Sequence, residues 1–238
     1  MPISPNSNIA CTFNKSILER IIFLLPLLIT LVFICIFVYF PDTYLWLIHE
    51  DGIVEYAQAL LFLCASIVGF LSIWRIRKSQ YKQIFWILLI FAVGCLFIFL
   101  EEISWGQRLL NIKTPFFFLL HNTQYEINVH NMDVFKGKTG WPYIIIGICG
   151  IGWIFIRNSN LKAADLRSFI IPEWYCCLYL LPRGIFSAYN YMPLENKGIV
   201  IWPQIAWWRH QEPLEFLLAL GFFLVALGNY QKVAKLIK

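Results

Sequence analysis

The stretch that decides the fold runs from residue 84 to residue 108 and reads IFWILLIFAVGCLFIFL-EEISWGQR. Its first part, Ile84–Leu100, is apolar without interruption. Such a run is typical of a helix that crosses a membrane, since about 20 apolar residues span the hydrocarbon core. The run then meets two adjacent carboxylates, Glu101 and Glu102, and after them Arg108. The sequence therefore predicts a spanning helix with a polar site at one of its ends.

The composition of the whole chain has the same character. Of the 238 residues, 59% are hydrophobic and only 14% are charged, whereas a soluble domain is about one quarter charged. The mean hydropathy is +0.65. These values exclude an ordinary soluble domain and predict an all-α, polytopic transmembrane helical bundle. Six of the seven cysteines lie inside apolar runs, which is typical of small core residues and not of a disulfide framework.

We expect a single transmembrane domain over residues 1–238, in which about six helices cross the membrane. The expected spans are residues 17–40, 52–74, 84–100, 141–156, 168–181 and 213–230. The segment between the third and fourth spans is apolar and aromatic in its middle and contains Pro115. That pattern favours an interfacial or re-entrant segment. Prolines and tryptophans gather in residues 182–211, which we expect at the depth of the lipid headgroups.

The distribution of charge predicts the orientation. With six spans, the segments around both termini, residues 75–83 and residues 157–167 lie on one side and hold 12 of the 19 Lys and Arg residues. The positive-inside rule then places both termini in the cytoplasm. Carboxylates sort the other way, with 11 of 14 at the outer ends of spans or in outer loops. A general basic-inside, acid-outside bias explains this as well as a functional cluster does.

Two of the expected helices begin with similar acidic patterns. Asp51 and Glu55 open the second span, and Glu212 and Glu215 open the sixth. Residues three or four apart share a helix face. Helix capping and the helix dipole explain Asp51 and Glu212 well, but they explain Glu55 and Glu215 less completely. The alternative is that these four carboxylates contribute to a site for zinc or a harder divalent metal ion.

The carboxylate pair at residues 101–102 has two interpretations. If the helix continues through Trp105 to Arg108, Glu101 and Arg108 share a face and form a structural ion pair. In the functional interpretation, one member of the pair stays protonated near neutral pH and acts as a general acid or as a proton or cation carrier. Arg108 then either pairs with Glu101 or holds an anionic headgroup.

Residues 121–131 read HNTQYEINVHN and are rich in hydrogen-bonding side chains. Glu126 and His130 fall on the same side whether the segment is extended or helical. A Glu–His pair can orient a general base or help to ligate a metal; the alternative is a solvated loop with ordinary hydrogen bonds. The candidate catalytic residues are therefore Glu101, Glu102, Glu126 and His130. The candidate substrate-binding residues are Arg108, Asn122, Asn128 and Asn131.

Three short segments carry a resemblance to other proteins: residues 101–108 (EEISWGQR), residues 114–117 (TPFF) and residues 122–131 (NTQYEINVHN). In them the chain resembles a group of bacterial multi-span membrane proteins with a Glu-Glu-Ile-Ser-Trp-Gly-Gln-Arg segment and an Asn-x-Gln-x-Glu-x-Asn-x-His-Asn segment. The likeness is close over about thirty residues. It implies the bacterial cytoplasmic (inner) membrane. The group has no activity that could be carried over.

A second likeness is to the glutamate-type intramembrane endopeptidases, which use Glu-Glu-x-x-x-Arg and, on a later helix, Phe-x-x-x-His. In this chain Arg108 stands two residues beyond that spacing. Phe117 and His121 match the second motif in letters but lie too close to the first in sequence. The chain thus departs from the family at both motifs.

Three functions fit these patterns. The first is a hydrolase or transferase, with or without a divalent metal ion, that acts on lipid in the outer leaflet. The second is a proton- or cation-coupled transporter that uses the carboxylates as a relay. The third is a non-catalytic membrane subunit. No zinc-protease, Cys-x-x-Cys, phosphate-loop or Gly-x-Ser-x-Gly motif is present. We expect membrane lipid, and no nucleic acid, as a partner; the sequence does not identify a substrate, a cofactor or a protein partner.

Overall fold

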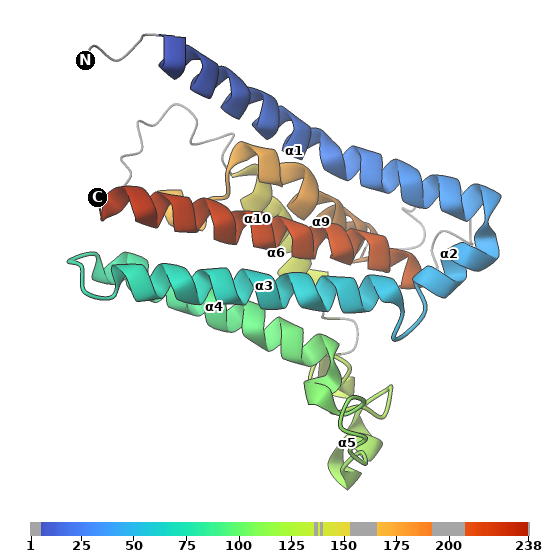
Figure 1. The fold of residues 1–238 in the computed structure, drawn as a ribbon. Helices are drawn as coiled ribbons and strands as arrows, with labels where there is room; N and C mark the ends of the chain where they lie inside the picture. Colours follow the sequence, from blue (N-terminus) through green and yellow to red (C-terminus); the bar gives the residue numbers. More distant parts are fainter. Residues whose placement is uncertain (1–5, 136–137, 139, 153–165, 192–207, 238) are drawn as a thin grey trace.

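Figure 1 shows the fold in a computed structural model, which describes residues 6–135, 138, 140–152, 166–191 and 208–237. All regular elements in these ranges are helical, and an isolated antiparallel bridge between Asn122 and Met132 is the one strand-like pairing among them. The all-α prediction is therefore confirmed. The elements are α1 (Asn6–Tyr39), α2 (Pro41–Leu47), α3 (Ile53–Ile76), α4 (Lys82–Glu102), η1 (Ser104–Gly106), α5 (Phe116–His121), η2 (Asp133–Phe135), α6 (Gly140–Ile151), α8 (Arg167–Ile170), η3 (Trp174–Cys176), α9 (Cys177–Tyr191), η5 (Trp208–Gln211) and α10 (Glu212–Leu236).

Four helices are long and apolar enough to cross a membrane. They are residues Ile17–Tyr39 of α1, together with α3, α4 and α10. Each is at least 21 residues long, and a helix of that length reaches across a hydrocarbon core about 30 Å thick. These helices coincide with the expected spans at 17–40, 52–74, 84–100 and 213–230. The chain is thus built as a membrane protein in these regions.

The other two expected spans, at residues 141–156 and 168–181, are not confirmed as membrane crossings in the described residues. Helix α6 has 12 residues where the structure describes it, about 18 Å of helix, and residues 153–156 of the expected span lie outside the described residues. The expected span at 168–181 is divided between α8 and α9. Pro172 explains the division, because it disfavours helical geometry in Ile171, which has φ −89° and ψ 121°. The long helix therefore starts only at Cys177.

Helix α3 forms the centre of the bundle and packs against both α4 and α10 (Figure 1). Small side chains make this close packing possible: Ala65 of α3, Cys95 of α4 and Ala226 of α10 are buried in one cluster. The Ser66 hydroxyl also donates a hydrogen bond of 2.9 Å to the carbonyl of Ala92. Small residues and interhelical hydrogen bonds are typical of helix packing in membranes, where water provides no hydrophobic driving force between helices.

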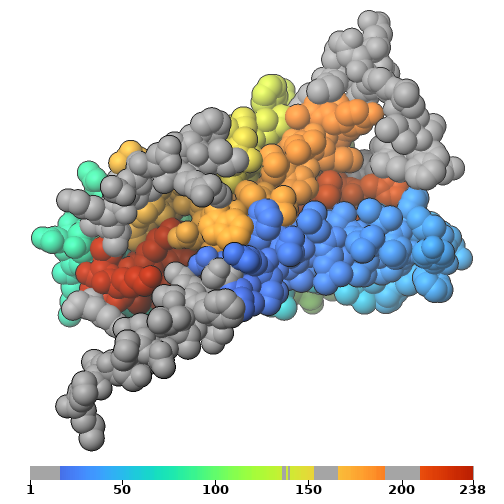
Figure 2. All heavy atoms as spheres, turned by 90° about the horizontal axis from the view of Figure 1, so that it is seen from above, coloured from blue at the N-terminus to red at the C-terminus, as the bar shows by residue number. Residues whose placement is uncertain are grey.

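Helix α1 lies along the outside of the bundle, over α9 and η3 (Figure 2). Most of its apolar side chains are exposed, which suits a surface that faces lipid. Pro26 lies inside the helix and lacks the N–H group that would bond to the carbonyl of Ile22. The hydroxyl of Tyr179 on α9 donates to that carbonyl at 2.6 Å. The proline thus frees a backbone acceptor that joins α1 to α9.

Helices α6 and α9 approach each other through glycines, and this contact gives a prediction. A Cβ atom on Gly184 would lie 2.8 Å from the Tyr143 carbonyl oxygen and 3.1 Å from the Gly147 Cα. Because backbone atoms cannot move aside cheaply, Gly184→Val should destabilise the protein by about 1–3 kcal/mol or more. Unfolding in mixed detergent micelles measures the change.

The matched control for this prediction is Gly94→Ala on α4, where an added Cβ would meet nothing within 4 Å. That variant should be neutral or should stabilise the helix by up to about 1 kcal/mol. Equal destabilisation by the two variants would show that the α6–α9 contact is not as close as described.

The two ends of the bundle differ in chemistry. The loop between α3 and α4, the beginning of α1 and the end of α10 lie at one end (Figure 1). The opposite end, called the site end below, contains α2, the first turns of α3 and α10 and the last turn of α4 (Figure 1). The segment 103–135, which contains α5, projects from this end. Most of the candidate functional residues belong to these elements, so the fold brings them to one end of the molecule.

Candidate functional site

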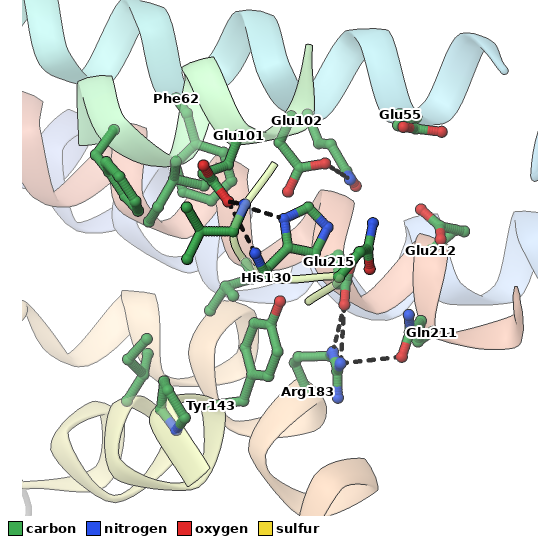
Figure 3. A pocket seen from close by; sticks show the side chains of 18 of the residues that line it. Glu55, Phe62, Glu101, Glu102, His130, Tyr143, Arg183, Gln211, Glu212 and Glu215 are labelled. Carbon is green, nitrogen blue, oxygen red and sulfur yellow. Dashed lines mark hydrogen bonds and ion pairs between the residues drawn. The ribbon is translucent and has the colours of Figure 1, made fainter. Parts of the chain in front are cut away.

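A cavity of about 500 Å³ opens at the site end of the bundle (Figure 3). Its size is within the range of small-molecule sites, about 300–1,000 Å³. Polar and charged residues from five parts of the chain line it: Glu55 and Gln58 of α3, Glu101 and Glu102 of α4, Gln124, His130 and Asn131 of the following segment, Arg183 of α9, and Glu212 and Glu215 of α10. Sequence-distant acids and an imidazole therefore do share one cavity, as the first functional hypothesis requires.

One wall of the cavity is apolar. Phe62, Phe97, Ile146, Leu218 and Phe222 all line it. The rings of Phe62 and Phe222 contact each other edge to face with centroids 5.6 Å apart. These residues belong to apolar helices, so this wall continues from the polar end toward the hydrocarbon-facing part of the bundle. A cavity with a polar end and an apolar wall suits an amphipathic ligand.

Glu101 anchors the segment that brings His130 to the cavity. Its Oε2 atom accepts hydrogen bonds from the backbone N–H groups of Val129 at 2.7 Å and His130 at 3.0 Å. Its Oε1 atom accepts a bond of 2.7 Å from the Trp105 indole. The carboxylate is buried, and these bonds satisfy both of its oxygens. Glu101 therefore positions His130, and a catalytic role for it stays a prediction.

The imidazole of His130 is oriented by the same carboxylate. Its Nδ1 atom lies 3.2 Å from Glu101 Oε2, an arrangement that favours the proton on Nδ1 and leaves Nε2 available. The ring lies between Glu102 and Glu215 in the cavity (Figure 3). Burial lowers the pKa of His130, but the hydrogen bond to Glu101 and the negative charges of Glu102 and Glu215 outweigh it, so the pKa lies above its ordinary value. His130 is thus placed to take up and release a proton.

The raised pKa of His130 predicts how stability depends on pH. A group with a raised folded-state pKa stabilises the protein fully below its unfolded pKa, about 6.5, and this contribution is lost as pH rises through the folded-state value. The melting temperature of the wild type should therefore exceed that of His130→Gln most at acidic pH, and the difference should shrink toward alkaline pH. Thermal unfolding of both proteins between about pH 5.5 and 8.5 measures it. A difference that grows with pH would contradict the described surroundings of His130.

Glu102 points away from Glu101 and lines the cavity (Figure 3). Its Oε2 atom accepts a hydrogen bond of 3.0 Å from the Gln58 side-chain amide. The carboxyl group also interacts electrostatically with His130 and Glu215. The two adjacent glutamates therefore have separate tasks: Glu101 holds the structure, while Glu102 faces the space where a ligand would lie.

Arg183 forms the other polar corner of the cavity. Its guanidinium donates to Glu215 at 2.9 Å and to Gln211 at 3.0 Å, and it also contacts the Ser187 hydroxyl. It lies over the Tyr143 ring, 3.8 Å from the ring centroid. Only 5% of Arg183 is exposed. A buried arginine is tolerated only with such partners, so Glu215 is a partner of Arg183 and no longer a free metal ligand.

Asn122, Glu126 and Asn128 of the same segment do not line the cavity and hydrogen-bond within the loop instead. Glu126 accepts hydrogen bonds from Ser104 at 2.5 Å and from Asn128 at 2.9 Å. The Asn122 amide donates to the Asn128 carbonyl and side-chain oxygens at 2.9 and 2.8 Å. Asn122, Glu126 and Asn128 are all buried. The structure thus shows a structural role for Asn122, Glu126 and Asn128, while catalysis by Glu126 and substrate binding by Asn122 and Asn128 stay predictions. Asn131 does line the cavity.

Arg108 does not pair with Glu101. It forms ion pairs with Glu126 and Asp51 and lies 3.5 Å from Glu50. The expected helical continuation fails because α4 ends at Glu102, and Ser104 and Trp105 have positive φ angles of 47° and 55°, followed by Gly106 at 77°. Such left-handed geometry ends a helix. Arg108 is thereby turned toward the α2–α3 connection, where three acidic groups surround it in place of a lipid headgroup.

The four carboxylates predicted to bind a metal are not arranged as ligands. Asp51 pairs with Arg108, and Glu215 pairs with Arg183. Glu55 accepts a hydrogen bond of 2.8 Å from the backbone of Asp51. Within the part of the chain that the structure describes, no three His, Cys, Asp or Glu side chains form a group that could hold a metal ion. Glu55, Glu212 and Glu215 line the cavity as polar groups instead.

Gln58, Tyr143 and Arg183 are among the cavity residues that were not singled out from the sequence. Arg183 did leave a signal, because it is the one basic residue in the run from Cys176 to Tyr191. An arginine within an apolar run is a functional-site candidate by default. Gln58 and Tyr143 gave no comparable signal, since a single polar residue on an apolar helix is common and only the packing shows which way it faces.

Comparisons of the chain with protein-family models, with curated proteins and with solved structures found no match. Neither a family nor a related fold therefore assigns an activity. The function has to be inferred from the chemistry of the cavity itself.

Proposed function

We propose that this chain is a membrane enzyme that hydrolyses a bond in a membrane lipid or transfers a group to or from it, with His130 as general acid and base. One observation carries the proposal: His130, oriented by Glu101 at 3.2 Å, faces a cavity that has both a polar end and an apolar wall. The first property supports proton transfer. The second supports a substrate with a polar head and an apolar chain.

The proton steps follow from the orientation of the imidazole. Nε2 of His130 removes a proton from water or from the hydroxyl of an acceptor, and the oxygen attacks the ester carbon or phosphorus of the lipid. The proton then passes from Nε2 to the leaving oxygen as its bond breaks. Glu101 stabilises the imidazolium that forms between the two steps, as a carboxylate does in other His–carboxylate pairs. Serine, threonine and cysteine are absent from the described residues that line the cavity, which favours an attacking oxygen from water or the acceptor.

Glu102 and Arg183 complete the polar surroundings of the reacting group. Glu102 lies beside His130, so its negative charge also stabilises the imidazolium. Arg183 is held by Glu215 and by the Tyr143 ring, and its position opposite His130 lets it orient the polar end of the substrate (Figure 3). Positioning of this kind lowers the barrier to reaction by restricting the geometry of approach.

The same proposal includes a place in the cell. We place the chain in the bacterial cytoplasmic membrane as a multi-pass protein with both termini in the cytoplasm and the cavity at the outer leaflet. The bias of 12 among 19 basic residues supports this orientation. The start of α1, the α3–α4 loop and the end of α10 lie at the same end of the bundle (Figure 1), which also supports this orientation. In this arrangement α6 and α9 supply the fifth and sixth crossings, and segment 103–135 lies in the outer interface.

Lipid analysis of a deletion strain tests the proposed activity. Loss of the gene should cause one lipid class to accumulate and its product to disappear, and the wild-type gene should reverse both changes. His130→Gln should fail to do so, since loss of acid–base catalysis reduces turnover by about 10²–10⁴-fold. The control is Glu173→Gln, whose carboxylate pairs with Lys232 at 3.1 Å away from the cavity. Full complementation by His130→Gln at equal protein level would overturn the proposal.

A further inference from the structure

The polar residues that line the cavity carry an excess of negative charge. Six are glutamates: Glu50, Glu55, Glu101, Glu102, Glu212 and Glu215. The cations among them are Lys138 and Arg183, with His130 when it is protonated. Arg183 is already bonded to Glu215. Ionised carboxylates in a partly buried site are costly unless positive charge is nearby, so the cavity suits a ligand that brings a cation.

A second observation points to a hydrogen-bond donor on that ligand. Gln58 lines the cavity and is 0% exposed, and its Oε1 atom has no hydrogen-bond partner among the described residues. The amide orientation is fixed, because Nε2 donates to Glu102 at 3.0 Å and a flipped amide would turn an oxygen toward the carboxylate. An unsatisfied buried acceptor costs about 1–3 kcal/mol. A ligand with an N–H group would satisfy it.

These observations separate an organic cation from a metal ion. In the described part of the chain no group of three His, Cys, Asp or Glu side chains could hold a metal, whereas an ammonium group accepts looser geometry from single oxygens on several sides. Gln58 and Glu102 lie next to each other on neighbouring helices and offer two such oxygens. In the apolar wall, Phe62 lies on α3, the helix of Gln58, and Phe222 lies on α10.

We infer that the cavity binds the primary ammonium group of an amine-bearing lipid, with Gln58 Oε1 and Glu102 as its acceptors and the acyl chain along the apolar wall. This inference rests on the proposed function and names its substrate class. A primary ammonium offers three N–H donors. A trimethylated ammonium has the same charge but no N–H group, and a glycerol headgroup has neither, so the inferred order of affinity is amine, then trimethylammonium, then glycerol.

Native mass spectrometry of the purified full chain in detergent micelles tests this order. The probes are dioleoyl phosphatidylethanolamine, phosphatidylcholine and phosphatidylglycerol at equal concentration, with free ethanolamine as a fourth arm. Retention of phosphatidylethanolamine should exceed that of phosphatidylglycerol by about tenfold or more, since hydrogen bonds to charged groups contribute at that level. Free ethanolamine should compete only weakly, because it lacks the chain. Equal retention of the three lipids, or complete competition by free ethanolamine, would overturn the inference.

A matched pair of variants tests the acceptor itself. Gln58→Leu should reduce the preference for phosphatidylethanolamine over phosphatidylcholine by about tenfold. Gln80→Leu makes the same change in an exposed glutamine of the α3–α4 loop and should leave the preference intact. An unchanged preference in Gln58→Leu would overturn the assignment of this acceptor. If Gln58→Leu does not fold, the wild-type comparison of the three lipids still decides the inference.

The inference and the proposed function fail in different ways. Binding does not need the proton transfer, so His130→Gln should keep the amine preference while it loses lipid turnover. If the protein prefers the amine lipid but the deletion strain shows no lipid change, the proposed enzymatic function is wrong and the inferred ligand stands. If turnover depends on His130 but is equally fast with amine-free lipids, the proposed enzymatic function stands and the inferred ligand is wrong.

Discussion

Replacing Arg183 by leucine is expected to destabilise the protein by about 3–5 kcal/mol, the range observed when one partner of a buried ion pair is removed. Arg183 is 5% exposed and donates to Glu215 and Gln211. Without it, Glu215 keeps a negative charge in a partly buried position and Gln211 loses a donor. Reversible unfolding in mixed detergent micelles measures the loss.

The double variant Arg183→Leu/Glu215→Leu is the control for this expectation. Removing both charges leaves no uncompensated carboxylate, so the double variant should be more stable than Arg183→Leu alone and should give a coupling energy of more than about 1 kcal/mol. Arg183→Lys should not restore stability fully, because one ammonium cannot replace the fork that bonds Glu215, Gln211 and Ser187. Strictly additive effects of the two leucine substitutions would show that this pair does not interact.

The second large effect is expected for Glu101→Gln, at about 3 kcal/mol or more, since bonds to a charged group contribute about 1.5–3 kcal/mol each. Glu101 accepts from the backbone of Val129, the backbone of His130 and the Trp105 indole. A neutral amide oxygen accepts these bonds more weakly. The NH₂ group of the glutamine cannot accept at all, so it would face N–H donors without forming a bond. Hydrogen exchange should accelerate at the amides of residues 129 and 130, while the amides at the centre of α3 stay protected.

The control for Glu101→Gln is Glu55→Gln. Glu55 accepts a hydrogen bond from the backbone of Asp51, and this bond is exposed to solvent. Its replacement should cost no more than about 1 kcal/mol. Similar losses in the two variants, or unchanged exchange at residues 129 and 130 in Glu101→Gln, would contradict the anchoring role of Glu101. Lipid turnover should also fall in Glu101→Gln, because the imidazole of His130 loses the partner that orients it.

The sequence predicted the helices well where the physics is local. Runs such as Ile84–Leu100 must be helical in a membrane, because backbone groups find no other partners there, and this predicted α3, α4 and α10 within a few residues. The prediction was poorer from residue 168 onward. Pro172 was placed inside an expected span although it restricts its neighbour, and the apolar run continues beyond Pro182 to Tyr191 in α9.

The candidate site was predicted in part, and the failures have a physical pattern. Glu55, Glu102 and Glu215 line the cavity because the helix ends that carry them meet at one end of the bundle, and His130 and Asn131 line it because Glu101 anchors their segment there. Spacing could not separate the two faces of segment 122–131. The contacts that orient this segment are with Glu101 and Ser104, and a sequence pattern does not show contacts between residues more than twenty positions apart.

The partner of Arg108 was missed for a related reason. Arg108 and Glu101 are close in sequence, so a helical spacing rule joined them. The observed partners are Glu126, 18 positions away, and Asp51 and Glu50, more than fifty positions away. Arg183 pairs with Glu215 across 32 positions. Pairing between distant segments is set by helix packing, and no local periodicity contains that information.

The central claim is that a lipid enters the cavity between α3, α4 and α10 with its polar end beside His130. Photolabelling of the purified protein with a phospholipid that carries a diazirine near the headgroup end of its acyl chain tests this claim directly. Adducts are expected on lining residues such as Phe62, Leu218 and Phe222, and excess unlabelled lipid should suppress them. Adducts confined to the exposed face of α1, at residues such as Leu24, Leu27 and Leu31, with none in the cavity, would contradict it.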